Sequence, residues 1–123
     1  MLKEKKTEEL LLKCLIYSFN SSQKNKTEKL LFQVSDWDKL INLACLHQVI
    51  FLLYYSLNKL QYLSYLPQNT LSFLKEIYFA NLIRNIILKK EFIQLLDLSR
   101  KRKIEFIPFK GFALLETIYS DPG

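Results

Sequence analysis

The apolar residues recur at the spacing of an α-helix over most of the chain. Between residues 7 and 20, Leu11 and Cys14 lie on one apolar stripe, which predicts a helix with Thr7 as its cap. Residues 20–27 are a run of Asn, Ser, Gln, Lys and Thr. Because this run offers no apolar face, it predicts an exposed linker.

A second helix is predicted to begin at the segment Ser35-Asp36-Trp37-Asp38. The Ser35 hydroxyl can accept a hydrogen bond from the Asp38 amide, and both aspartates favour the positive end of a helix dipole. His47-Gln48-Val49 then interrupts the apolar pattern. A further short helix is predicted to carry Leu52, Leu53, Leu57 and Leu60.

The longest predicted helix runs from about Gln68 to Arg100, after a stop at Pro67. It carries a broad apolar face and ends in the basic run Arg100–Lys103, whose cations oppose the negative end of the helix dipole. Short helices joined by short turns pack antiparallel or at an angle. The helical region is therefore predicted to span residues 1–103.

Residues 104–109 break with this pattern. Pro108 excludes a continuing helix, and the apolar residues face both sides, as in a strand buried within an α/β arrangement. A lone strand cannot satisfy its backbone groups, so we expect its sheet partners to come from residues after Gly123 or from another chain. Gly111 permits a turn into a helix predicted over 112–119. The predicted fold class is thus mainly α, with the first strand and helix of an α/β domain at 104–123.

The amino-acid composition excludes only a few classes of function. The chain has 18 Lys and Arg against 12 Asp and Glu, a net charge of +6, which permits nucleotide, nucleic-acid or acidic-lipid partners without requiring any. Half of the residues are hydrophobic, which argues against intrinsic disorder. Cys14 and Cys45 suggest neither a disulfide framework nor a zinc site. No secretory signal or membrane-spanning run is visible, so a cytoplasmic protein without membrane partners is expected.

The strongest candidate for chemistry is Lys110-Gly111. Glycine lets a phosphate approach the backbone, the following helix offers free amides, and Lys110 adds a cation. An ordinary strand-to-helix turn with a solvated lysine explains the same residues. His47 fits a helix cap, and no nucleophile partner is identifiable for it. The carboxylates of Asp36, Asp38 and Asp121 do not make a two-metal site.

The tyrosine and phenylalanine residues are predicted to pack rather than to bind bases. Several of them recur at helical spacing without interleaved cations, which is not the pattern of a stacking platform; they are Tyr54, Tyr55, Tyr62, Tyr65, Tyr78 and Phe79. Nucleic acid is therefore not the expected partner. The remaining argument for it is the set of cations at Lys89, Lys90 and Arg100–Lys103.

Two blocks of the sequence resemble the uncharacterised bacterial nucleotidyltransferase family of the polymerase-β-like superfamily. The specific block is Ile107-Pro108-Phe109-Lys110-Gly111, with Leu114 and then Tyr119-Ser120-Asp121-Pro122-Gly123. The helical part is similar to the family's N-terminal region through Trp37, Ala44, His47-Gln48-Val49 and Asn85.

The resemblance implies that the strand and the glycine turn are the first strand and the phosphate loop of the transferase fold. The complete family protein is then expected to use Mg²⁺ and a nucleoside triphosphate. An Arg and an Asp-x-Asp are expected shortly after the turn at Asp121-Pro122-Gly123. Only Lys110 and Gly111 carry over, as nucleotide phosphate-binding residues, and Phe112 replaces the usual Gly or Ser.

These expectations combine into one main hypothesis and two alternatives. The chain is expected to be the N-terminal fragment of a nucleotidyltransferase, inactive alone and binding no metal, because the Asp-x-Asp carboxylates are absent. The first alternative is a non-enzymatic helical interaction module, in which residues 104–109 self-associate or pair with a partner strand. The second is a helical nucleic-acid-binding domain.

Overall fold

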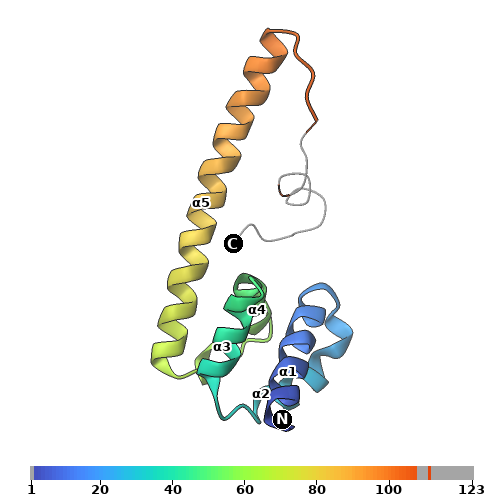
Figure 1. Ribbon diagram of the computed structural model, residues 1–123, viewed down its shortest axis with the longest axis vertical. Coiled ribbons are helices and arrows are strands. Elements are labelled where there is room, and N and C mark those ends of the chain that lie inside the picture. The colour runs from blue at the N-terminus through green and yellow to red at the C-terminus, as the bar shows by residue number, and fades with distance from the viewer. Residues whose placement is uncertain (1, 108–110, 112–123) are drawn as a thin grey trace. The chain divides into compact units, whose positions relative to one another are not determined.

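Helices account for most of the computed structural model, which describes residues 2–107 and 111. The α-helices in this part are α1 (Leu2–Phe19), α2 (Lys24–Leu31), α3 (Trp37–Leu46), α4 (Ile50–Lys59) and α5 (Gln68–Lys101) (Figure 1). Two 3₁₀ turns accompany them, η1 (Ser21–Gln23) and η2 (Leu63–Tyr65). The predicted mainly α fold class is confirmed.

The chain divides into two compact units within α5. The first is Met1–Tyr78 and the second is Phe79–Gly123. The predicted boundary between residues 103 and 104 concerns family domains and stays a prediction. Among the helices of the part described, none is both long and apolar enough to cross a membrane.

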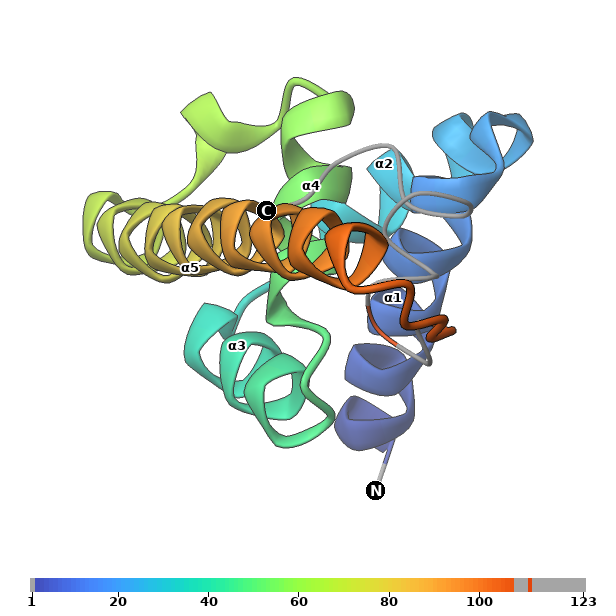
Figure 2. The same ribbon diagram turned by 90° about the horizontal axis from the view of Figure 1, so that it is seen from above.

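The first unit is a helical bundle with one core. α1 packs most extensively on α4 and also contacts α2 and α3, as Figure 2 shows from above. The start of α5 closes this core with Leu74, whose side chain is 1% exposed. The other fully buried large side chains come from the earlier helices: Leu31, Leu40, Leu53 and Leu57.

One buried hydrogen bond joins α1 to α4. The Ser56 hydroxyl donates to the backbone carbonyl of Cys14 at 2.6 Å, and both residues are fully buried. Farther along, the Lys59 ammonium donates to the carbonyl of Ser18 at 3.4 Å and lies 5.2 Å from the ring centroid of Tyr17. The C-terminal end of α1, where carbonyls lack helical partners, thus receives a cation from α4.

Burial separates the two cysteines chemically. Cys14 is buried and Cys45 is exposed, and desolvation raises the pKa of the Cys14 thiol to about 12. We expect one thiol per chain to react with a thiol reagent in native buffer, and two in denaturant. A Cys45→Ser variant is the control and should show no native reaction. Two reactive thiols in the native protein would contradict the structure.

The shifted Cys14 pKa also sets a direction for stability against pH. The unfolded thiol ionises near pH 9 and the folded thiol near pH 12. Its contribution to folding is therefore fully present below pH 9 and is lost as the pH rises from 9 to 12.

Three local predictions at the N-terminal side are wrong. Thr7 is not a cap, because α1 already begins at Leu2. The predicted linker over 20–27 is instead η1 and the first turn of α2, with Thr27 fully buried. The cap of α3 is Asp36 rather than Ser35, since the Asp36 carboxylate accepts from the Lys39 amide at 2.9 Å.

The predicted stops, by contrast, are confirmed at residues 47–49 and at Pro67. After α3, the Val49 amide donates to the Ala44 carbonyl at 2.9 Å, and Gln48 has a φ of 56°. This is a Schellman ending, which normally places glycine at the left-handed position. The same geometry recurs in the described chain at two further non-glycine residues, Gln61 (φ 57°) and Lys103 (φ 56°).

Left-handed backbone at a residue with a Cβ costs stability that glycine avoids. We therefore expect Gln48→Gly and Gln61→Gly each to raise the free energy of unfolding by about 0.5–1 kcal/mol. Urea unfolding measures this free energy, and its slope against urea concentration should stay unchanged. Gln61→Ala keeps the Cβ and should give no gain; an equal gain from alanine would show that backbone geometry is not the cause.

The second unit contains the C-terminal part of α5 and the segment after it. The chain reverses at Lys103, where the Ile104 amide donates to the Ser99 carbonyl at 2.9 Å, and Figure 1 shows this turn in orange. The Phe106 ring then packs edge-on against Phe92, with centroids 6.0 Å apart. Large apolar side chains of this part of α5 remain 37–58% exposed: Phe79, Ile83, Ile86, Ile87, Leu88, Ile93, Leu95 and Leu98.

The strand predicted over 104–109 is not observed in its described part. Residues 104–107 are neither helical nor paired, and Ile107 is 91% exposed. Without a neighbouring strand in the described residues, this segment has no ladder to join. Residues 108 and 109, and the helix predicted over 112–119, lie outside the described residues.

Candidate functional site

The candidate phosphate loop lies mostly outside the part that the structure describes. Lys110 is outside it, together with Asp121. Gly111 is described and is exposed, and a Cβ built on it meets no atom within 4 Å. Phosphate binding by Lys110 and Gly111 therefore stays a prediction.

The other candidate residues serve local structure and are not brought together for chemistry. His47 caps the C-terminal end of α3 through its backbone amide, and its side chain is exposed. Asp36 caps the N-terminal end of the same helix, and Asp38 follows within the first turn. Within the described ranges, no three His, Cys, Asp or Glu side chains are grouped so as to hold a metal ion.

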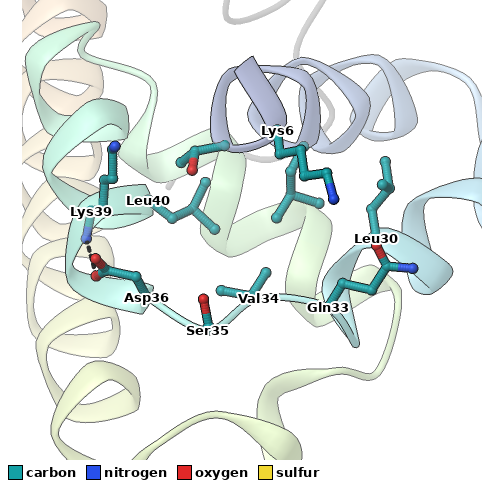
Figure 3. Close-up of a pocket in the computed structure, with 10 residues that line it drawn as sticks. Lys6, Leu30, Gln33, Val34, Ser35, Asp36, Lys39 and Leu40 are labelled. Atoms are coloured by element: carbon teal, nitrogen blue, oxygen red, sulfur yellow. Dashed lines mark hydrogen bonds between the residues drawn. The ribbon is translucent and has the colours of Figure 1, made fainter. Parts of the chain in front are cut away.

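A small pocket lies where the loop before α3 meets α1. Its volume is about 170 Å³. Figure 3 shows Lys6 reaching from α1 toward Leu30 and Gln33, while Asp36 bonds the Lys39 amide on the opposite side. The pocket combines two lysines with one carboxylate. Because that carboxylate already occupies the start of α3, the helix end is not open to a phosphate.

Four aromatic rings lie close together beside the same loop. Phe32 and Trp37 stand at its two ends, and Tyr62 and Tyr65 come from the region of η2. The Tyr62 ring lies 5.3 Å from Phe32, 5.2 Å from Tyr65 and 6.2 Å from Trp37, measured between centroids. We call these four residues the aromatic cluster.

Burial differs sharply within the aromatic cluster. Tyr62 is 6% exposed, whereas Phe32 and Tyr65 are each 64% exposed. The Phe32 and Tyr65 rings also contact each other edge-on, with centroids 5.8 Å apart. Burial raises the pKa of the Tyr62 hydroxyl, and the neighbouring Tyr65 raises it further. The Tyr62 hydroxyl is therefore neutral at physiological pH. The buried Tyr62 ring contacts the two exposed rings and supports them.

The sequence pattern did not reveal this cluster. Tyr62 and Tyr65 are among the residues predicted to pack, and their rings do contact each other, although Tyr65 is 64% exposed. Phe32 is not singled out by the sequence pattern. The rings come from segments about thirty residues apart in the chain. Only the tertiary fold brings them together, so no local spacing could have predicted the surface.

Comparison with known protein families assigns the chain to one of them. A family model described as an uncharacterised nucleotidyltransferase matches residues 33–123. The chain belongs to this family. Searches of curated proteins and of solved structures found no match.

The nucleotidyltransferase match begins inside the helical unit. It includes α3, α4 and α5, and it starts one residue after Phe32. α1 and α2 precede it, yet they contribute to the same core through Leu11, Cys14 and Leu31. The matched region therefore folds here against a preceding helical segment.

Proposed function

We propose that the chain is the helical front part of a nucleotidyltransferase of the polymerase-β-like superfamily. The parent reaction would move a nucleoside monophosphate from a nucleoside triphosphate to an acceptor hydroxyl. The family match over residues 33–123 carries this proposal. Lys110 and Gly111 are proposed to contact the triphosphate, through a cation and an open backbone turn. The free cysteines fit a reducing compartment such as the cytoplasm.

The metal chemistry of this reaction needs carboxylates that the described residues do not bring together. We therefore propose that residues 1–123 alone transfer no nucleotide. The test incubates the pure chain with magnesium and labelled nucleoside triphosphates, with and without oligonucleotide acceptors. Labelled product above the level of a heat-denatured control would contradict the proposal. Absence of product agrees with it.

A second candidate function is a helical interaction module, which the exposed apolar part of α5 favours. A helix that is apolar on most sides is normally buried, and contiguous exposed apolar surface marks interaction sites. Residues 104–109 are proposed to add to this surface by pairing with a partner strand. Light scattering over a concentration series tests self-association. A monomer at all concentrations would contradict the self-associating form.

A further inference from the structure

We propose that the aromatic cluster is a stacking surface for a nucleobase. The inference rests on the proposed function, because it assigns to the helical unit a part in holding the nucleotide or the acceptor. It concerns residues 32, 37, 62 and 65, all within the first compact unit. None of them belongs to the loop at Lys110 and Gly111.

The geometry of the rings supports stacking. Tyr62 is anchored in the core, with three rings of the cluster around it within 6.2 Å. Phe32 and Tyr65, each 64% exposed, leave most of their ring surface open to solvent. A base has an apolar face of similar size, and stacking on an aromatic side chain contributes to binding for every base.

The charges near the cluster set the orientation of a bound nucleotide. The Phe32 amide donates to the Glu28 carbonyl at 3.1 Å, so helical geometry continues to Phe32. Lys29 is therefore one turn away on the same side of α2 and is exposed. Asp36 and Asp38 flank Trp37 and would repel a phosphate there. Glu28 is also one turn from Phe32, and its carboxylate lies 3.8 Å from the Lys24 ammonium. A base on Phe32 and Tyr65 is therefore proposed to place its phosphate on the side of Lys29.

The surroundings of the rings favour a base over a peptide. The segment around Tyr65, from Gln61 to Thr70, carries no charged residue, which suits the neutral face of a base. Lys29 on α2 is three residues before Phe32, Lys39 is two residues after Trp37, and the whole chain carries a net charge of +6. An anionic aromatic ligand matches both features.

Trp37 supplies the readout, because it is the only tryptophan of the chain and belongs to the cluster. Its fluorescence is titrated with adenosine triphosphate, with a single-stranded oligoadenylate, with a duplex RNA and with a proline-rich peptide. We expect one of the first two probes to quench Trp37 and to saturate, and the duplex, whose bases are already stacked, to bind less tightly. Saturation by the mononucleotide alone assigns the surface to the triphosphate, and saturation by the strand alone assigns it to the acceptor.

The variants separate stacking from other causes. Removing both exposed rings, Phe32→Ala with Tyr65→Ala, should weaken binding about tenfold or more, while Tyr65→Phe keeps the ring and should stay within about twofold. Leu46→Ala, at a residue 75% exposed, removes apolar surface without a ring and should have no effect. Lys29→Gln should flatten the salt dependence of binding, and Asp38→Asn should not weaken it.

Three results would overturn the inference. The first is that neither nucleotide probe quenches Trp37. The second is that the double alanine variant binds as tightly as the original chain while its helical circular dichroism is intact. The third is that the proline-rich peptide binds instead, and that its binding depends on the rings. The measurement needs neither metal nor turnover. A chain that binds a base but transfers nothing keeps the inference, whereas a failed stacking test leaves the nucleotidyl-transfer proposal standing.

Discussion

A chain that begins at Gln33, where the family match starts, is expected not to fold into the helical unit. The deletion removes α1 and α2 and with them five buried apolar core residues, Leu10, Leu11, Cys14, Tyr17 and Leu31. Burial of a large apolar side chain contributes about 1.5–3 kcal/mol, so the loss is roughly the whole stability of a typical domain. The buried Ser56 hydroxyl also loses its acceptor on Cys14.

Circular dichroism and urea unfolding measure this result. The deletion variant should lose its cooperative transition, whereas the full chain should keep one. A matched pair of point variants checks the cause without deleting anything. Leu11→Ala removes a side chain that is 4% exposed and should cost about 2–5 kcal/mol. Leu12→Ala, at a neighbour that is 58% exposed, should cost little. A cooperative unfolding transition in the deletion variant would refute the role given to α1.

The helices that match the family need a preceding segment to cover their apolar faces. α3 and α4 both contact α1. They carry Leu40, Ala44, Leu53 and Leu57, all of which are fully buried in the described structure. A family member with a different preceding segment would need another cover for these faces. The segment before the match is therefore part of the folding unit, although the match to the family begins only at residue 33.

Periodicity predicted the helices well because their apolar stripes are long and regular. α5 was placed within one residue of its observed end, since Pro67 fixes its start and the basic run closes it. The Asp36 cap was misplaced by one residue because Ser35 and Asp36 are both good capping residues, and only the local backbone selects between them.

Two features could not be predicted from the sequence, and each has a physical reason. α2 carries four polar residues in its first turn, and its buried Thr27 is not an apolar residue, so its amphipathic face was hidden in a polar run. The aromatic cluster depends on contacts between Phe32 and residues of the η2 region. Such contacts are set by packing, and no period along the chain records them.

Leu74→Ala is expected to be the most damaging single substitution in the start of α5. The Leu74 side chain is 1% exposed and belongs to the core of the first unit. Its removal should lower the free energy of unfolding by about 2–5 kcal/mol, through lost burial and the cavity that remains. Tyr78, one turn later, packs on Tyr54 at 4.4 Å between ring centroids, and cannot fill a cavity at Leu74 without giving up this contact.

Phe73→Ala is the matched control, because its larger side chain is adjacent in sequence yet 43% exposed. Its cost should be smaller than that of Leu74→Ala, although more atoms are removed, because area withdrawn from water and not side-chain size determines the loss. Urea unfolding of both variants decides the order. If Phe73→Ala proved the more damaging, Phe73 rather than Leu74 would have to lie on the face of α5 that packs into the core.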